Sequence, residues 1–321
     1  MSLAEIAPVS LFEQFDGDCW AGRIPTPQQY AVKLPQSLIA KFNSFFNSNP
    51  PPADAELDAY VHDMGTHSLF TQQIRSALFR FCGFVVTGAT PEEWLQDRRA
   101  RAYYAWLCTQ VGRLDYKLGP FYEVYDRGQE NYTLTTRYSD THLSHGFHTD
   151  GTSRNTMPDV VGLMCIRQAI SGGENHLSNV VDVHQRLLDT AYNSLIELYK
   201  PIMRDCTVPA GFTPEQILRA HTYPVFEWGA QGRGFTFRYM RRWIDVAYQR
   251  LNETIPAKLI TALDALDREL VNPANMLTLK LKKGEVLLLN NLKIAHDRSA
   301  FSTDLVGNRL MLRAWLNVNF R

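Results

Sequence analysis

The sequence has few cysteines and no excess of either charge. Its five cysteines are scattered and form no C-x-x-C pair. An odd, dispersed set is typical of reduced thiols in a cytosolic protein, and it argues against a disulfide framework or a cysteine-based zinc site. Lys and Arg number 33, as do Asp and Glu, so the net charge is zero. The basic excess typical of nucleic-acid-binding chains is therefore absent.

Long apolar runs are absent as well. No stretch reaches the roughly 18 apolar residues that a membrane-spanning helix needs. Residues 1–18 carry acids and lack a basic start followed by an apolar stretch, so they do not resemble a secretory signal. We therefore expect a cytoplasmic protein that binds a small molecule, with neither a membrane nor nucleic acid as partner. A homo-oligomer is compatible with the sequence.

The chain does have enough apolar material for a large core. Hydrophobic residues make up 45% of its 321 residues, and β-rich folds of this length are commonly single domains. The strongest break in the pattern is Asn49-Pro50-Pro51-Pro52, which ends an N-terminal arm. We predict one domain over residues 1–321, made of an arm over residues 1–52 and a core over residues 53–321.

Four segments carry helix signals. Thr90-Pro91-Glu92-Glu93 has the form of a capping box with proline at the first helical position, and it predicts a helix that runs to about Cys108. Thr213-Pro214-Glu215-Gln216 is a second capping box. Apolar residues at helical spacing predict further helices over Val181–Leu198 and Pro256–Leu270.

Strand signals lie mainly in the last part of the chain. Leu277, Leu279 and Leu281 alternate with polar residues, which is the period of a half-buried strand. Gly284–Asn290 predicts a second strand after a Lys-Lys-Gly turn. Earlier in the chain, Phe81–Val86 has the pattern of a helix end, a glycine turn and a short strand.

The last strand shows the alternation most clearly. One face carries Leu310, Leu312, Ala314, Leu316, Val318 and Phe320, and the other carries Arg309, Met311, Arg313, Trp315, Asn317 and Asn319. Helices in the first third and the middle, with strands around them, predict an α+β fold. The expected core is a jelly-roll β-sandwich, a double-stranded β-helix, buttressed by helices.

A His-x-Asp pair is the strongest candidate for chemistry. On a strand, His148 and Asp150 point to the same face. A histidine from another strand would complete the two-histidine, one-carboxylate triad of non-haem iron(II) oxygenases. Two alternatives stay open. Asp150-Gly151 could be a surface turn, and His142, His145 and His148 could form a zinc cluster, although Gly146 disfavours the helix that this spacing needs.

Two arginines near the end of the chain strengthen the case for an anion-binding site. His296 follows the apolar strand and the polar Asn290-Asn291 turn, and Arg309 and Arg313 follow His296. The two arginines share a face with Met311 and Trp315, so that face is expected to be enclosed. A buried guanidinium needs an anionic partner, and its planar fork suits a carboxylate.

Together these motifs resemble the TauD/TfdA dioxygenases and their clavaminate-synthase-like relatives. The resemblance covers roughly residues 70–321. It rests on His-Thr-Asp, the distal histidine, Arg-x-x-x-Arg in the last strand, and four segments that are similar to parts of that family: Phe81–Val86, Val160–Ala169, Gly172-Gly173-Glu174 and His296–Phe301. It implies an enzyme that uses iron(II), 2-oxoglutarate and dioxygen to oxidise an unactivated C–H bond.

The resemblance also implies residue roles. His148, Asp150 and His296 would bind iron, and Arg309 would hold the distal carboxylate of 2-oxoglutarate. Arg313 would lie beside Arg309 and face the substrate or the cosubstrate. Asn175 occupies a position where the family often has threonine, and its amide can donate the same hydrogen bond to 2-oxoglutarate.

The substrate is less well defined by the sequence. Residues 131–147 would line the cavity mouth, which makes Tyr132, Arg137 and Tyr138, together with Arg313, candidates for substrate binding. We expect a small polar substrate, amino-acid-like or another carboxylate. Hydroxylation is the default outcome, but desaturation and cyclisation need the same residues. A non-catalytic jelly-roll binding protein and a zinc hydrolase are the alternatives from other functional classes.

Overall fold

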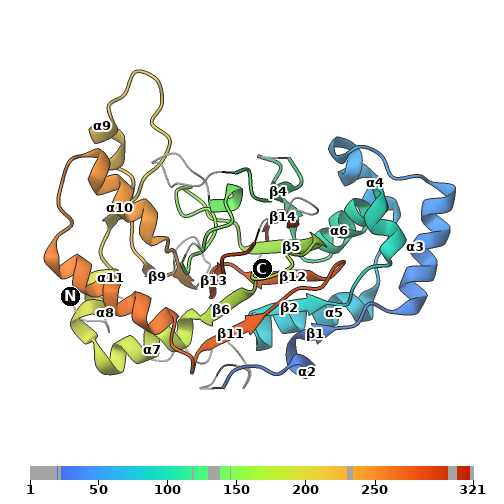
Figure 1. The fold of residues 1–321 in the computed structure, drawn as a ribbon, viewed down its shortest axis with the longest axis horizontal. Helices are drawn as coiled ribbons and strands as arrows, with labels where there is room; N and C mark the ends of the chain where they lie inside the picture. The colour runs from blue at the N-terminus through green and yellow to red at the C-terminus, as the bar shows by residue number, and fades with distance from the viewer. Residues whose placement is uncertain are drawn as a thin grey trace.

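The computed structural model describes residue 20 and residues 23–117, 119–128, 138–144, 146–229, 234–302 and 309–318. Its two largest β-sheets lie at the centre, and helices gather on both sides of them (Figure 1). The architecture mixes helices and strands, as the sequence predicted. In the described part of the chain, no helix is both long enough and apolar enough to cross a membrane.

The larger sheet has seven strands in the order β1-β2-β12-β5-β14-β3, and β4 also pairs with β14. Its strands are β1 Ala31–Val32, β2 Phe84–Thr87, β3 Arg113–Leu114, β4 Tyr122–Val124, β5 Val160–Arg167, β12 Val286–Asn290 and β14 Leu310–Asn317. β1 runs parallel to β2, and the other pairs are antiparallel. All five residues of β12 are buried, because both faces of this sheet are covered.

The smaller sheet has three antiparallel strands in the order β11-β6-β13. They are β6 Asn175–Asn179, β11 Met276–Leu279 and β13 Ile294–Arg298. An apolar cluster joins the two sheets, with Leu177 and Ile294 from the smaller sheet and Leu287 and Met311 from the larger one. Because alternate strand residues share a face, the residues two positions from these also face the space between the sheets.

Helices of the first third pack on the larger sheet, most of them on its opposite face, while Tyr30 of the first helix packs on Phe84 in the cluster between the sheets. They are α2 Pro27–Tyr30, α3 Gln36–Ser48, η2 Asp54–Glu56, α4 Leu57–Asp63, α5 Ser68–Ser76, η3 Ala77–Phe81, η4 Glu92–Gln96 and α6 Arg99–Thr109. Phe42 of α3 and Trp106 of α6 pack in one apolar cluster with Leu288 and Leu312 of the sheet. The helices expected in the first third of the chain are therefore present, and α3 contributes to the core.

Helices of the middle part lie at the other end of the molecule (Figure 1). They are α7 Val180–Thr190, α8 Tyr192–Leu198, α9 Pro214–Leu218, α10 Arg241–Arg250 and α11 Ala257–Leu270, with η5 Tyr138–Asp140 earlier in the chain. Two short antiparallel pairs accompany them, β7 Ile202–Met203 with β8 Thr222–Tyr223, and β9 Phe226–Trp228 with β10 Phe235–Phe237. Their apolar cluster includes Ala295 of β13, which links this end to the smaller sheet.

Several predicted elements are confirmed. β14 alternates as expected: Met311 packs between the sheets, whereas Leu312, Ala314 and Leu316 pack under the helices. Thr213 and Gln216 form the capping box that opens α9. The helix predicted over Pro256–Leu270 is α11. The strands predicted near residues 84, 277 and 286 are β2, β11 and β12.

Two predicted helices were wrong in extent. The helix expected from Thr90 to Cys108 is two pieces, η4 and α6, and no side chain caps the first one. Asp97 between them is extended and ends η4, and its side chain accepts a hydrogen bond from N of Arg99, the first residue of α6, at 2.8 Å. The helix expected over Val181–Leu198 breaks at Ala191, which lies outside the helical region.

The cysteines of the described residues are not in disulfides. Cys82, Cys108 and Cys165 are buried and Cys206 is half-buried, and none of the four forms a disulfide. This agrees with the prediction of reduced cysteines.

Candidate metal centre

His148, Asp150 and His296 converge at one end of the space between the sheets. Nε2 of His148 lies 3.8 Å from Oδ1 of Asp150, and Nε2 of His296 lies 3.9 Å from the same oxygen. The three potential ligand atoms lie within 4.8 Å of one another. Two imidazole nitrogens and one carboxylate oxygen can therefore approach a single ion from one side.

The backbone brings the two histidines together through a single residue pair. His148 N donates to His296 O at 2.9 Å, and His296 N donates to His148 O at 2.9 Å. His148 forms isolated bridges and is not part of a strand, so the predicted strand over residues 148–150 was wrong. The chain turns at Gly151, whose φ is 72°. A Cβ at Gly151 would lie 2.7 Å from Pro158 Cδ, so the turn that sets Asp150 needs glycine.

Hydrogen bonds orient the side chains of the triad, and Arg313 Nη1 lies 3.5 Å from Asp150 Oδ1. Nδ1 of His148 lies 3.0 Å from Gly146 O, so this nitrogen carries the proton and Nε2 presents its lone pair. Oδ2 of Asp150 accepts a hydrogen bond from Trp315 Nε1 at 2.7 Å. Oδ1 of Asp150 faces the histidines. The tautomer of His148 and the orientation of Asp150 thus suit a metal ligand set.

Burial and charge set the ionisation of the triad. Burial and the neighbouring His148 lower the pKa of His296 to about 3, so its imidazole is neutral at pH 7. Burial alone would raise the pKa of Asp150. The Arg313 guanidinium and the two imidazoles outweigh burial, and the pKa of Asp150 is lowered below its ordinary value. A neutral imidazole beside an ionised carboxylate is the protonation state that a metal requires.

The donor chemistry fits iron(II). Two imidazoles and one carboxylate, all from one side, form the facial set of non-haem iron oxygenases. The zinc cluster considered from the sequence is not supported by the described residues, since Nδ1 of His142 lies 3.1 Å from Asp126 Oδ2 and His142 does not join the triad. His145 lies outside the described residues.

The triad opens into a cavity of about 740 Å³. It contains two buried side chains, Arg309 and Asn175, that each have a nitrogen without a hydrogen-bond partner among the described residues. Arg309 is 3% exposed, its Nε lacks a hydrogen-bond partner, and no carboxylate of the described residues lies within 4.0 Å of it. Burial lowers the pKa of Arg309 to about 10, so the side chain stays charged at pH 7.

Asn175 of β6 lies two residues before Leu177, on the face directed at the larger sheet. It is 4% exposed, and its Nδ2 has no hydrogen-bond partner. A buried donor without a partner is costly, so both Asn175 and Arg309 fit an anion that enters the cavity. A dicarboxylate such as 2-oxoglutarate has that chemistry.

Arg313 is placed differently from Arg309. Its Nη1 lies 3.3 Å from Asp150 Oδ2, and its guanidinium carbon lies 5.2 Å from the Tyr122 ring centroid and 5.0 Å from that of Trp315. Part of its charge is therefore matched by the triad carboxylate. The role predicted for Arg313 toward substrate or cosubstrate stays a prediction.

The other predicted substrate-binding residues are not tested by the structure. Tyr132 and Arg137 lie outside the described residues. Tyr138 begins η5, and only its backbone is described.

Asn291 is a site residue that the sequence analysis did not single out. It is fully buried, accepts from Asp150 N at 2.8 Å and donates through Nδ2 to Asp150 O at 3.0 Å and Pro158 O at 2.9 Å. Its amide thus fixes the backbone on both sides of the Asp150 turn. The only sequence signal was its place in a polar turn directly after a buried strand.

Replacing Asn291 by alanine should destabilise the fold. The change leaves the buried N–H and C=O of Asp150 without partners, which should lower the free energy of unfolding by about 2–4 kcal/mol. Urea denaturation of the apo protein measures this. Asn47, exposed on α3, provides the matched control, since Asn47→Ala removes no hydrogen bond that holds the site. Equal stability of the two variants would contradict this role of Asn291.

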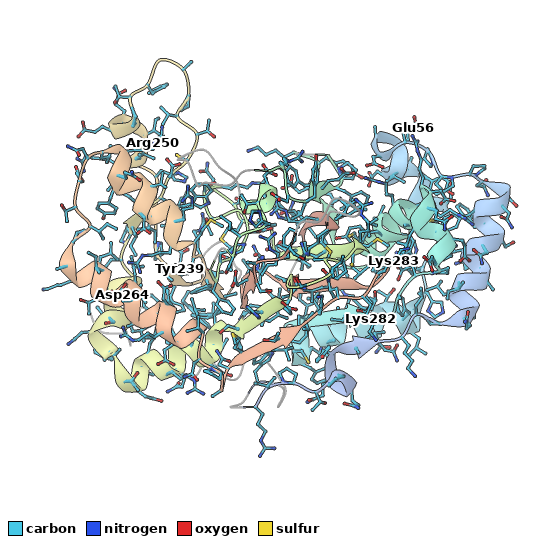
Figure 2. The ribbon with its side chains drawn as sticks, viewed as in Figure 1. Glu56, Tyr239, Arg250, Asp264, Lys282 and Lys283 are labelled. Atoms are coloured by element: carbon cyan, nitrogen blue, oxygen red, sulfur yellow. The ribbon has the colours of Figure 1, made fainter. Side chains whose placement is uncertain are left out.

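A network of hydrogen bonds and ion pairs connects residues 148–150 to α11. Thr149 N donates to Tyr239 O at 2.8 Å, and the Tyr239 hydroxyl donates to Asp267 Oδ1 at 2.5 Å. Arg241 pairs with Asp267 and with Asp264, each at 2.9 Å. Figure 2 labels Tyr239 and Asp264 on this side of the molecule. The backbone at Thr149, between His148 and Asp150, is therefore linked through Tyr239 to Asp267 of α11.

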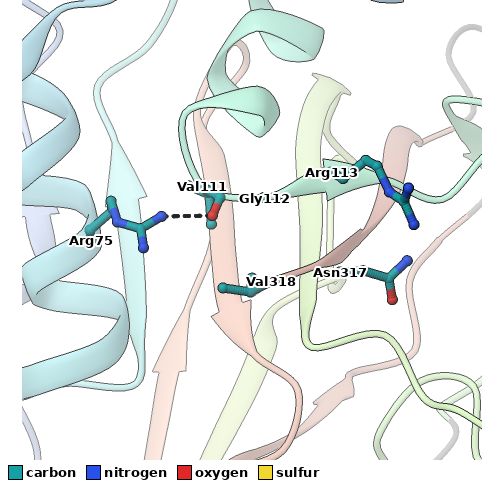
Figure 3. Close-up of a pocket in the computed structure, with 6 residues that line it drawn as sticks. All are labelled: Arg75, Val111, Gly112, Arg113, Asn317 and Val318. Carbon is teal, nitrogen blue, oxygen red and sulfur yellow. Dashed lines mark hydrogen bonds between the residues drawn. The ribbon is translucent and has the colours of Figure 1, made fainter. Parts of the chain in front are cut away.

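A second cavity, of about 380 Å³, lies away from the triad. Arg75 Nη1 donates to Val111 O at 2.7 Å at its edge, and Arg113 and Asn317 lie farther along it (Figure 3). None of the predicted site residues lines this cavity. The candidate site is therefore the larger cavity.

Comparison with protein families gives one match over most of the chain. The model of the taurine catabolism dioxygenase TauD, TfdA family matches residues 52–315. FR-33289 synthase of Streptomyces rubellomurinus is 28% identical over 201 residues, which are 60% of this chain and 55% of that protein. The match to this relative thus spans little more than half of its length.

Solved structures with the same fold include oxygenases. Non-heme iron oxygenase OrfP in complex with Fe and alpha-ketoglutaric acid has a TM-score of 0.63 at 11% identity, covering 90% of this chain and 94% of that one. OrfP with Fe and L-Arg gives 0.61 at 13%, with the same 90% and 94% coverage. Asparagine oxygenase AsnO gives 0.59 at 16%, covering 90% and 93%. At these identities the likeness shows a shared fold.

Proposed function

The chain belongs to the taurine catabolism dioxygenase TauD, TfdA family, and on this premise we propose that it is an iron(II)- and 2-oxoglutarate-dependent oxygenase. Its proposed reaction is the oxidation of an unactivated C–H bond in a small, anionic, amino-acid-like substrate. The observation that carries the proposal is a cavity that holds the His148–Asp150–His296 triad together with the buried Arg309, whose Nε lacks a hydrogen-bond partner and which has no acidic partner among the described residues.

Each part of the cavity has a proposed task. His148, Asp150 and His296 would hold iron(II), while Arg309 and Asn175 would bind the distal carboxylate of 2-oxoglutarate. When bound, iron(II) would allow dioxygen to oxidise both 2-oxoglutarate and the substrate: one oxygen atom would enter the succinate that forms from 2-oxoglutarate with release of carbon dioxide, and the other would go to the substrate in a hydroxylation or leave as water in a desaturation or cyclisation. The protein contributes positioning and the exclusion of water. Arg309 is buried, so water is largely excluded from its guanidinium and an anionic ligand can bind there in a fixed position.

The charge of the cavity supports an anionic substrate. Among the described residues, its lining includes the six cationic side chains of Lys117, Arg154, Arg250, Arg298, Arg309 and Arg313 and the three carboxylates of Asp150, Asp205 and Asp297. Arg154 also pairs with Asp115 outside the lining, which leaves an excess of two positive charges. Bound iron(II) would add further positive charge. A dianionic cosubstrate offsets part of this excess, and a substrate carboxylate would offset more. Relatives of this fold bound to L-Arg or named for asparagine support an amino-acid-like molecule.

The fold supports the proposal at a finer level. We infer that the two facing sheets are the two layers of a jelly-roll, double-stranded β-helix core, since they are mainly antiparallel and pack on one apolar cluster. We also infer that residues 1–321 form one domain, because α3 before the Asn-Pro-Pro-Pro break packs into the same core as the helices after it. The free cysteines support a reducing, cytoplasmic environment.

A substrate screen tests the proposed function. Purified enzyme with iron(II) and 2-oxoglutarate is incubated with amino acids and other small carboxylic acids, and succinate is measured for each. We expect an anionic, amino-acid-like compound to stimulate succinate formation and to gain an oxygen atom. Mass spectrometry of the product separates hydroxylation from desaturation or cyclisation. Stimulation only by compounds that carry no carboxylate would contradict the substrate class.

A further inference from the structure

The two oxygens of the Asp150 carboxylate have different surroundings. Oδ1 lies 3.8 Å from His148 Nε2 and 3.9 Å from His296 Nε2, which is the side where a metal would bind. Oδ2 accepts the Trp315 indole N–H at 2.7 Å and lies 3.3 Å from Arg313 Nη1. Arg313 Nη1 also lies 3.5 Å from Oδ1, so Arg313 contacts both oxygens, whereas the short Trp315 hydrogen bond goes to Oδ2 alone and turns Oδ1 toward the histidines.

The Trp315 ring is itself held by charged groups. The guanidinium carbons of Arg154 and Arg313 lie 5.2 Å and 5.0 Å from its centroid, within cation–π range. Arg154 Nη2 pairs with Asp115 Oδ2 at 2.6 Å, and Asp115 N donates to Trp315 O at 2.8 Å. Asp115 therefore anchors both the backbone of Trp315 and one of the arginines against its ring.

We propose that Trp315 is a positioning residue that makes Asp150 bind iron through one oxygen, and that the Asp115–Arg154 pair is its anchor. The inference rests on the proposed function, because it assumes that iron binds the triad. A carboxylate that loses this hydrogen bond is free to turn and to offer both oxygens. The second oxygen would then occupy a coordination position that the cosubstrate needs.

This arrangement predicts that removal of the Trp315 N–H donor lowers the affinity for iron(II). Partners that hold metal ligands typically change metal affinity by 10–100-fold when they are removed. Trp315→Phe keeps an aromatic ring beside the arginines but lacks the N–H donor. It should weaken iron(II) binding roughly 10–100-fold. It should also weaken the visible absorption band of the anaerobic iron–2-oxoglutarate complex, although Trp315 is not the proposed carboxylate-binding residue.

The test is calorimetric titration of apo protein with iron(II) under anaerobic conditions, with thermal melting of each apo variant. Trp228→Phe is the matched control, because Trp228 of β9 packs in the apolar cluster of the middle helices. We expect Trp315→Phe to lose iron affinity and Trp228→Phe to keep it. Iron affinity of Trp315→Phe within about twofold of the wild type would overturn the inference.

Asp115→Asn keeps the test decisive if Trp315→Phe does not fold. The substitution weakens the pair with Arg154 without touching the indole, so we expect a smaller loss of iron affinity, about three- to tenfold. An unchanged affinity in Asp115→Asn would overturn the proposed anchor. Failure of the wild-type protein to bind iron(II) would instead overturn the proposed function, and the two failures are thus distinguished.

Discussion

Asp150→Ala should abolish both iron binding and 2-oxoglutarate turnover. Asp150 supplies the one carboxylate of the triad and balances the charge of Arg313. Without it, a divalent ion would meet two imidazoles and a largely buried guanidinium, which repels it. The loss of iron affinity should exceed the roughly 100-fold limit that is typical for residues that only support a ligand.

The measurement is an anaerobic iron(II) titration followed by an assay of succinate formation. Asp126→Ala is the matched control, because Asp126 is also a buried acid beside a histidine, His142, but lies outside the triad. We expect the control to bind iron like the wild type. If Asp150→Ala kept iron affinity within about tenfold of the wild type, the proposed ligand set would be wrong.

Arg309→Ala should weaken 2-oxoglutarate binding without a matching effect on iron. A charge-assisted hydrogen bond from a guanidinium to a carboxylate contributes about 1.5–3 kcal/mol, so its loss should raise the dissociation constant roughly 10- to 100-fold. Arg309→Lys should recover only part of the affinity, since an ammonium group lacks the planar fork. Because Arg309 has no acidic partner among the described residues, its removal should leave no carboxylate buried and unpaired.

Titration of the iron-loaded variants with 2-oxoglutarate in the absence of oxygen measures this effect. Arg313→Ala is the informative comparison, because Arg313 lies on the same strand but contacts Asp150. We expect Arg313→Ala to disturb iron binding more than Arg309→Ala does. An unchanged 2-oxoglutarate affinity in Arg309→Ala, together with a large loss in Arg313→Ala, would move the carboxylate-binding role to Arg313.

The sequence predicted the elements whose signal is local and periodic. The alternation in β14 gave both faces of that strand, because each face is covered by a different apolar layer. The predicted helix from Thr90 to Cys108 failed although its opening resembled a capping box. The backbone is extended at Asp97, which separates η4 from α6. The Asp97 side chain accepts a hydrogen bond from Arg99 N at the start of α6, and no periodic pattern in the sequence indicates this break.

The proximity of His148, Asp150 and His296 was predicted, whereas their role as metal ligands stays a prediction and the residues that support them were not found from the sequence. His148 and Asp150 are adjacent enough in sequence to form a motif, and the resemblance supplied His296. The prediction that His148 and Asp150 lie on a strand was wrong, because His148 pairs with other segments only through isolated bridges. Isolated bridges leave no alternating pattern in the sequence. Asn291 contacts a residue 141 positions away, and Trp315 one 165 positions away, so no local pattern reports either contact.

The central claim is tested most directly by oxygen-dependent conversion of 2-oxoglutarate to succinate in the purified protein. The assay compares iron(II) with zinc, each with and without oxygen, in the presence of the stimulating substrate from the screen. The account predicts succinate only when iron(II) and oxygen are both present, and none with His296→Ala. Succinate formation that is indifferent to oxygen, or substrate hydrolysis with zinc and no succinate, would contradict it.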